Sequence, residues 1–364
     1  MMDKTVSATL MAVNLVATIM VIAIHYNSKA FIDTSSGYNL NYLLQDFFLN
    51  GISRVAVPIF ALVSGFIIWD KLTLNNAYVL LLKNRAKTQL FPYVIASFII
   101  LVSYNIITYL FKPEDFYPLS ITSVLYGTLV SPESPQLWFL RDLMFLVLLS
   151  PLLLCKVISI HLILAGLLCI LWFLNIQIFP VVGDYYLISI ETLFFFSLGG
   201  ICAYKSIVIK SLINMKGTGK LLVIMTWISL ILVRIYIDPS LDVWYVENYS
   251  MTSLFLYKLS IIVGIMATFC LCRPLAFNQL VIYLSGLTFF AFLFHLVPLS
   301  YFRIFTEKLI TKELSFFINF PIALLSVFYV AHIIAKKFPK VFAVLSGGRN
   351  PSKALMRANR STNN

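Results

Sequence analysis

The sequence predicts an all-α protein, a polytopic bundle of about ten transmembrane helices with both chain termini in the cytoplasm. Three observations predict this class: the hydrophobicity, the length of the apolar runs and the distribution of charge between them. Of the 364 residues, 60% are hydrophobic and only 12% are charged, and the mean hydropathy is +0.91. Soluble domains carry roughly 25% charged residues. A water-soluble fold cannot hide this much apolar surface, because its outside must be largely polar.

The apolar runs are continuous and about 17–24 residues long, which favours helices over the alternating strands of a membrane barrel. Helices also let every backbone polar group bond within its own segment, as a bilayer requires. In chain order the predicted spans are 7–26, 52–69, 89–111, 137–155, 160–179, 187–204, 220–237, 252–272, 280–302 and 314–335.

The loops between these spans alternate in charge at every helix end. One set is basic and contains Lys4, Lys71, Lys83, Arg85, Lys87, Lys156, Lys205, Lys210, Lys216, Lys220, Arg273, Lys336, Lys337, Lys340, Arg349, Lys353, Arg357 and Arg360. The other set is acidic and contains Asp33, Asp46, Glu114, Asp115, Glu133, Asp184, Asp238, Asp242, Glu247, Glu307 and Glu313. Lys and Arg accumulate in cytoplasmic loops, so the basic loops and both termini are placed there. This distribution explains the net charge of +12, and we expect no nucleic-acid partner.

Residues 1–340 are expected to form one transmembrane domain, and residues 341–364 a short polar cytoplasmic tail without fixed structure. The longest outer loop, residues 112–136, is rich in Pro and Ser; it either caps a site or only connects two helices. The sequence contains no nucleotide-binding fingerprint, no Ser-His-Asp spacing and no metal-ligand cluster, so no metal is expected.

Polar side chains within the spans are functional candidates, because ionisable groups are costly inside a bilayer. Steps of three and four residues place two polar stripes on single helix faces. These stripes are Asn14, Thr18 and His25 in the first span, and Ser285, Thr288, Phe292 and His295 in the ninth. Asn14 and His25 are eleven residues apart, roughly 16 Å along a helix, so the first stripe crosses about half of the hydrocarbon thickness.

The predicted topology gathers six ionisable side chains in the outer half of the membrane: His25, Arg54, Arg141, Asp142, Glu191 and His295. Charges at this depth should face one another or a wet cavity, and an imidazole accepts and returns a proton near neutral pH. The arginines would orient a histidine or a substrate, with the two acids balancing their charge. Structural alternatives stay open: an interfacial histidine without a task, ion-paired or snorkelling arginines, and a hydrogen-bonded His295. His161 and His332 lie near cytoplasmic helix ends and are interpreted as incidental.

A basic run formed by Lys83, Arg85 and Lys87 precedes the third span. It either sets the topology of the chain or recognises a phosphate-bearing ligand from the cytosol, for which Arg and Lys are suited.

Several stretches together resemble the membrane acyltransferase-3 family, over the whole hydrophobic part of the chain. They are residues 21–25 (VIAIH), 52–60 (ISRVAVPIF) with 64–66 (SGF), the basic run before Pro92 and Tyr93, 137–142 (LWFLRD) and, more weakly, 283–295 (YLSGLTFFAFLFH). The resemblance implies a bacterial ten-helix protein of the cytoplasmic (inner) membrane, surrounded by membrane lipid. It also implies transfer of an acyl group, often acetyl, from acetyl-CoA or another acyl-CoA to a hydroxyl of an extracytoplasmic glycan or lipid-linked saccharide.

The same resemblance implies roles for particular residues. His25 corresponds to the essential first-helix histidine, and Lys83, Arg85 and Lys87 would hold the CoA phosphates. The chain departs from the family at two places: Asn14 stands where an arginine is usual, and Thr88 follows Arg85 where a second arginine is common, with Lys87 as a possible substitute. We therefore count Asn14 among the donor-binding candidates. The alternative is a transporter or polysaccharide-export component without chemistry, because intramembrane charges also serve substrate pathways. The acceptor, the acyl group and the oligomeric state stay open.

Overall fold

A computed structural model describes residues 3–26, 40–72, 77–111, 113–116, 118–129, 132, 134, 136–155, 157–178, 188–205, 207–239, 249–310, 312–352 and 354–355. The prediction of an all-α fold is confirmed over these residues, which contain no β-strand. Some loop charges named above lie outside the described residues: Asp33, Glu133, Lys156, Asp184, Asp242, Glu247, Lys353, Arg357 and Arg360.

Six segments of the described chain are long and apolar enough to cross a membrane. They are Lys4–Ile24, Leu40–Trp69, Tyr78–Leu110, Gly217–Ile237, Met251–Leu275 and Leu314–Lys337. Each contains or overlaps one of the ten predicted spans, and two further spans correspond to the shorter apolar helices Ile158–Phe173 and Ile190–Tyr204. The chain is therefore a multi-pass membrane protein, while the count of ten and the orientation of the termini stay predictions.

In chain order, the helices at the N-terminal half are α1 (Lys4–Ile24), α2 (Leu40–Asp46), η3 (Phe47–Gly51), η4 (Ile52–Val55), α3 (Ala56–Leu72), α4 (Ala77–Arg85), η5 (Ala86–Leu90), α5 (Phe91–Phe111), η6 (Pro113–Asp115), α6 (Ile121–Leu129), α7 (Leu137–Leu148) and α8 (Ser150–Leu153). Those that follow are α9 (Ile158–Phe173), α10 (Ile190–Tyr204), α11 (Ile207–Ile213), α12 (Gly217–Ile237), α13 (Met251–Cys272), η7 (Arg273–Leu275), α14 (Gln279–Ser285), α15 (Thr288–Phe294), α16 (Leu296–Leu309), α17 (Lys312–Lys337) and α18 (Pro339–Leu345).

Two predicted spans are interrupted. The segment predicted at 137–155 is divided into α7 and α8, because Pro151 has no N–H for the carbonyl of Val147; the Ser150 hydroxyl donates to that carbonyl instead, at 2.7 Å. The segment predicted at 280–302 is divided into α14, α15 and α16. Its second break, at His295, precedes Pro298, which cannot donate to the carbonyl of Phe294.

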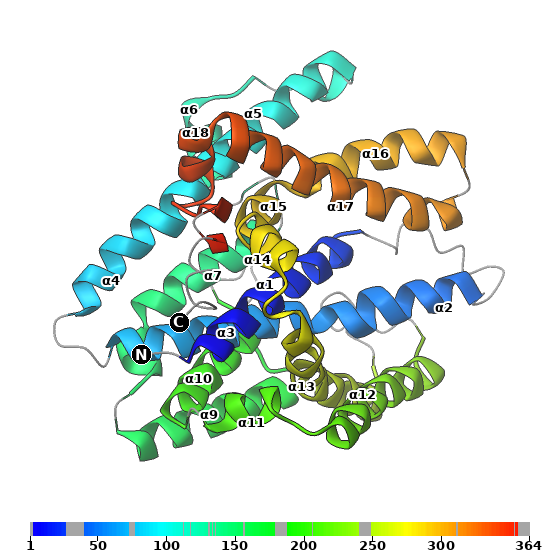
Figure 1. The fold of residues 1–364 in the computed structure, drawn as a ribbon. Helices are drawn as coiled ribbons and strands as arrows, with labels where there is room; N and C mark the ends of the chain where they lie inside the picture. Colours follow the sequence, from blue (N-terminus) through cyan, green and yellow to red (C-terminus); the bar gives the residue numbers. More distant parts are fainter. Residues whose placement is uncertain are drawn as a thin grey trace.

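Helix α1 lies in the interior of the described bundle, where 61% of its apolar window is buried. It packs against α3, α13, α14 and α15, and in Figure 1 it runs through the middle of the molecule. Helices α3 and α10 approach each other closely because both carry glycine at the contact. A side chain at Gly65 would collide with the carbonyl of Phe196, and one at Gly199 with the carbonyl of Leu62. Small residues at helix contacts allow such close packing in membrane proteins.

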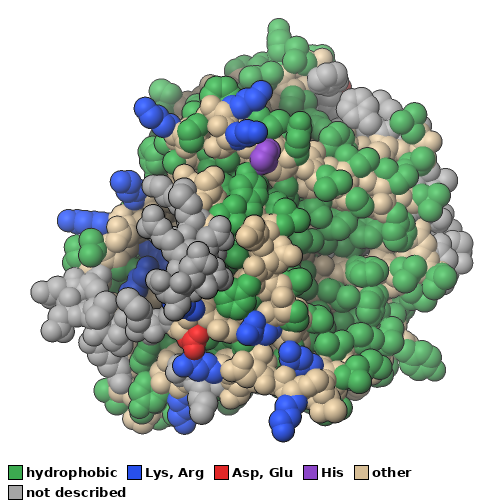
Figure 2. Space-filling model, in the orientation of Figure 1, with side chains coloured by type: hydrophobic (Ala, Val, Ile, Leu, Met, Phe, Trp, Pro, Cys, Tyr) green, Lys and Arg blue, Asp and Glu red, His purple; other side chains and the backbone are tan. Residues whose placement is uncertain are grey.

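The molecular surface has the character expected of a membrane protein. Figure 2 shows hydrophobic side chains over much of one face, most continuously on its right side, with Lys and Arg on its upper, left and lower parts. Exposed large apolar side chains include Leu221, Leu222 and Tyr236 of α12, and Leu325 and Tyr329 of α17. Such an apolar surface is stable in contact with lipid, whereas in water it would make the molecules associate.

The C-terminal residues are more ordered than we expected from composition. Residues 341–345 belong to α18, which packs against α5 and α17. Beyond α18, Ser346 and Gly347 are buried, so this part of the tail belongs to the folded body.

Candidate active site

The two predicted polar stripes lie side by side. The Asn14 side-chain amide donates to the Thr288 hydroxyl at 2.7 Å, and the His25 and His295 rings lie 5.1 Å apart between centroids, at an interplanar angle of 58°. The pairing therefore extends from the middle of α1 to its end. It joins the first and ninth predicted spans through polar groups, although the ninth is interrupted.

The two histidines are oriented by backbone carbonyls. His25 Nδ1 lies 2.8 Å from the carbonyl oxygen of Val21, and His295 Nδ1 lies 2.9 Å from that of Phe292. A carbonyl can only accept, so each Nδ1 carries the proton, and each neutral ring presents Nε2 as a lone pair. His295 is fully buried, and its Nε2 has no hydrogen-bond partner among the described residues. Two imidazole rings are thus held next to each other at the end of α1.

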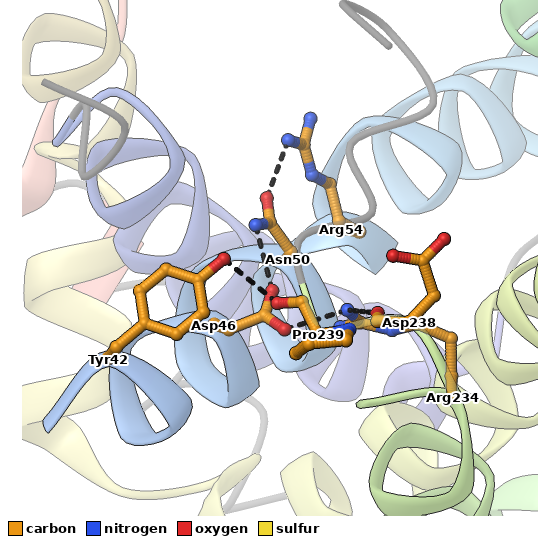
Figure 3. A network of polar contacts seen from close by, with 7 residues as sticks. All are labelled: Tyr42, Asp46, Asn50, Arg54, Arg234, Asp238 and Pro239. Carbon is orange, nitrogen blue, oxygen red and sulfur yellow. Dashed lines mark hydrogen bonds and ion pairs between the residues drawn. The ribbon is translucent and has the colours of Figure 1, made fainter. Parts of the chain in front are cut away.

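Arg54 belongs to a chain of polar contacts that reaches a buried ion pair (Figure 3). It donates to the Asn50 side chain at 2.8 Å, and Asn50 donates to Asp46 at 2.9 Å. Asp46 in turn accepts from Arg234 at 2.8 Å. Arg54 interacts electrostatically with His25 as well as with Asp46. The network therefore fixes a cation beside the histidine pair.

The irregular turns of this region explain how the network forms. Helix α2 is followed by a π-helical turn, η3, and a 3-10 turn, η4. Pro58 has no N–H to offer the carbonyl of Arg54, which disfavours a regular α-helix through these residues. Asp46, Asn50 and Arg54 are spaced four residues apart, and the turns place their side chains on one side, where each forms a hydrogen bond with the next. Single π-turns are frequent at functional sites.

Arg141 and Asp142 are buried near the start of α7. Their closest charged atoms are 3.9 Å apart. The other Asp142 oxygen accepts from the Ser189 backbone N–H at 3.1 Å and the Thr192 hydroxyl at 3.2 Å. Asp142 thus ties α7 to the start of α10.

Glu191 lies in a second buried cluster rather than beside Arg141. It accepts from the Trp172 indole N–H at 2.9 Å and interacts electrostatically first with Lys258 and more weakly with Arg54. The Lys258 ammonium lies 4.8 Å from the Trp172 ring centroid and donates to the Asn175 side chain at 3.1 Å. The six candidates thus divide into three groups: the histidine pair with Arg54, the pair of Arg141 with Asp142, and Glu191 with its partner Lys258.

A cavity of about 570 Å³ lies along the two stripes and begins near the two chain termini. Its lining includes Ser7, Asn14 and Thr18 of α1, Ser285 and Thr288 of the second stripe, and Arg349 beyond α18. Three mutually contacting rings, Phe60, Phe139 and Phe292, also line it, and Phe292 contacts the His295 ring at 6.3 Å. The cavity therefore leads toward the histidine pair and reaches the aromatic residues next to it.

Only one residue of the basic run, Arg85, lines this cavity. Arg85 is half-buried and lines it, as does the buried Gln89 of η5, whereas Lys83 and Lys87 are exposed and do not. Lys87, which the sequence suggested as a substitute for a second arginine, is absent from the lining of this cavity. Residues able to hold an anionic ligand here are Arg85 and Arg349.

Three buried charges were not singled out as site candidates from the sequence: Arg234, Lys258 and Asp46. Arg234 and Lys258 lie inside predicted spans, so the cost of a charge in a bilayer would have identified them. Arg349 could not be found this way, because it follows the last predicted span. His161 and His332 are absent from the cavity lining; His161 forms a hydrogen bond with Ser197, and His332 forms one with Tyr283. Their interpretation as incidental stays a prediction.

Comparison with known proteins identifies the class of this membrane protein. A family model described as an acyltransferase domain, Acyl_transf_3, matches residues 12–336, and the chain belongs to this acyltransferase family. The chain is 25% identical to the succinoglycan biosynthesis protein ExoH of Rhizobium meliloti, over 97% of this chain and 95% of that protein. No solved structure matches the chain significantly. Within the described residues, no group of His, Cys, Asp and Glu is suited to hold a metal ion.

Proposed function

We propose that this protein transfers an acyl group, first of all acetyl, from a cytosolic acyl-CoA to a hydroxyl of an extracytoplasmic glycan or lipid-linked saccharide. The observation that carries the proposal is the cavity that joins Arg85 and Arg349 to the polar stripes leading to His25 and His295. The family model supports acyl transfer, and the similarity to a protein of succinoglycan biosynthesis supports a glycan as the acceptor.

In this proposal His25 acts as the general base. Its Nδ1–H is held by the Val21 carbonyl, which leaves Nε2 to take the proton of the acceptor hydroxyl. The hydroxyl oxygen forms a bond to the thioester carbonyl carbon, the carbon–sulfur bond breaks, and the proton passes from His25 to the departing thiolate. The same lone pair also permits a relay. In that case Nε2 bonds to the thioester carbonyl carbon and the carbon–sulfur bond breaks, releasing the thiolate; the acceptor hydroxyl oxygen then bonds to the acyl carbon, the nitrogen–carbon bond breaks, and the hydroxyl proton goes to the thiolate.

Arg54 and Arg141 would act on charge that develops during transfer. Arg54 is held beside His25 by the Asn50 contact, where a cation stabilises the oxyanion of a tetrahedral intermediate. Arg141, Asp142 and Glu191 would support this geometry through helix packing, since Asp142 joins α7 to α10.

The test is to supply labelled acetyl-CoA to membranes containing the wild type or His25→Ala and to measure label in glycan. We expect the substitution to lower the rate by roughly 10²- to 10⁴-fold, the range for loss of a general base. Equal transfer by both proteins would contradict the catalytic role. Mass spectrometry of surface glycans with and without the protein would identify the acyl group.

A transporter or export component is the second candidate function, favoured by Asn14 at the place of a family arginine. The two candidates differ in one measurement. Loss of acetyl groups from a surface glycan with unchanged export supports the enzyme, whereas loss of export with unchanged acetylation supports the transporter.

A further inference from the structure

Two arginines from distant parts of the chain, Arg85 and Arg349, line the same cavity. Arg85 ends α4, and Arg349 follows α18. No Asp or Glu is among the described lining residues, and neither arginine forms a salt bridge within the described part of the chain. The charge of Arg85 disfavours that of Arg349, so the described part of the fold holds positive charge there without a carboxylate to compensate it.

Arg349 is fixed in this position by its own contacts. Its Nη1 donates to the carbonyl of Ser346 at 2.8 Å, and its guanidinium carbon lies 3.8 Å from the Phe289 ring centroid, a cation–π geometry. Burial and the charge of Arg85 lower the pKa of Arg349 to about 10. The side chain therefore stays cationic at neutral pH.

The backbone that carries Arg349 is docked on the turn that follows Arg85. Gly347 has a positive φ of 64°, and a side chain on it would collide with the carbonyl of Thr88 in η5. That carbonyl cannot receive the usual helical hydrogen bond, because the residue four positions later is Pro92. On the other side, a side chain at Gly286 would collide with Pro351. The segment 346–351 is thus fitted between η5 and the start of the second stripe.

A buried acceptor lies beside the two arginines. Gln89 is 3% exposed and lines the cavity, and its Oε1 has no hydrogen-bond partner among the described residues. An unpaired buried acceptor costs free energy unless a ligand supplies a donor. The lining therefore combines two cations with an acceptor that has no partner among the described residues, which suits a ligand with phosphate groups and N–H donors.

We propose that Arg349 and Arg85 together bind the phosphate groups of the donor, so that the segment after α18 completes the donor site. This inference rests on the proposed acyl-CoA donor. It assigns to Arg349 the positive charge that is absent at Asn14 and Thr88. Planar guanidinium groups bind phosphate oxygens through paired hydrogen bonds, and Gln89 accepts from an N–H of the same ligand.

The test measures binding of CoA and of phosphate-free pantetheine to the purified full-length protein in detergent. Arg349→Gln is expected to weaken CoA binding by about tenfold or more, as expected for loss of a charge-assisted hydrogen bond, with pantetheine binding unchanged. Arg349→Lys is the second variant, for the case that Arg349→Gln does not fold, and is expected to weaken CoA binding only a few-fold. Lys340→Ala removes an exposed charge from α18 and is expected to bind both ligands as the wild type does.

The outcomes separate this inference from the proposed function. If the wild type binds CoA and neither Arg349 variant changes its affinity, the inference is wrong and the donor assignment stands. The same holds if Arg349→Gln weakens pantetheine binding as much as CoA binding. If the wild type binds inorganic pyrophosphate but not CoA, and Arg349→Gln loses pyrophosphate, the phosphate site stands and the donor is wrong. If the wild type binds neither CoA nor pyrophosphate, both the inference about Arg349 and the proposed donor are wrong.

Discussion

The hydrogen bond from His25 Nδ1 to the Val21 carbonyl, 2.8 Å long, decides which ring nitrogen is left to react. His295 is held in the same tautomer by Phe292, so the neighbouring rings present equivalent lone pairs at Nε2. If His25 takes a proton, the His295 lone pair is an acceptor close by, and the two residues would act as one unit. Residues that act as a unit lose activity non-additively when both are replaced.

The first prediction follows from this pair. We expect His25→Gln to lower single-turnover acyl transfer by roughly 10²- to 10⁴-fold and His295→Gln by less, because only His25 removes the acceptor proton. The double variant should be no slower than His25→Gln alone. His332→Gln, whose wild-type ring bonds Tyr283 away from the cavity, serves as the control and should transfer normally. Losses that multiply in the double variant would show that the histidines act separately.

At the scale of elements, the ion pair of Asp46 and Arg234 connects the end of α2 to α12. Both side chains are almost completely buried, and Asp46 also receives the Asn50 amide that leads to Arg54. Breaking a buried pair leaves an uncompensated charge, whereas removing both partners restores neutrality.

The second prediction uses this difference. Asp46→Asn and Arg234→Met should each destabilise the protein by about 3–5 kcal/mol, and the double variant by clearly less than their sum. The free energy of unfolding in detergent is the measurement. Lys210→Met breaks the exposed pair with Asp3 and should leave stability unchanged. Additive losses would mean that the pair contributes no coupling.

The third prediction concerns the contact between α3 and α10. Gly65→Ala places a methyl group on the carbonyl of Phe196, so the helices must separate, at a cost of about 1–3 kcal/mol or more. Gly166 of α9 has no atom within 4 Å of the added carbon, and Gly166→Ala should stabilise its helix by about 0.5–1 kcal/mol. The two variants therefore change thermal stability in opposite directions. A neutral Gly65→Ala would contradict the close packing.

At the scale of the whole molecule, the proposed reaction needs a donor from one side of the membrane and an acceptor from the other. The cavity is lined by residues near both chain termini, Ser7 and Ala354, and the histidine pair lies at the opposite end of α1. The charge distribution of the loops predicts that the termini face the cytoplasm. This orientation would give acyl-CoA access to Arg85 and Arg349.

The fourth prediction tests that orientation. In a variant without the native cysteines, Lys340→Cys in α18 should react with a membrane-impermeant maleimide only after the membrane is opened. Glu114→Cys in the loop after α5 should react in intact cells, since Glu114 is exposed and lies in an acidic loop. The reversed labelling pattern would place the donor site outside the cell and contradict the proposed reaction.

Hydropathy and helical periodicity predicted much of the fold and part of the site. They located the helices and aligned Asn14 with His25 on one face, because three- and four-residue steps define a helix face. They did not predict the breaks at Pro151 and His295, because a hydropathy average does not register a missing N–H. Nor did they select Arg234 or Lys258, whose effect depends on the partners Asp46 and Glu191.

The sequence by itself determined the membrane class, the family resemblance and the two polar stripes, because these depend on composition and on order along the chain. Only the tertiary structure decided that the stripes face each other, that Lys87 lies outside the cavity, and that Arg349 lies inside it. The physical reason is that periodicity defines a face within one helix but not which helix covers it. Packing brings residues 85 and 349 to the same cavity. No local sequence pattern predicts a contact between residues so far apart along the chain.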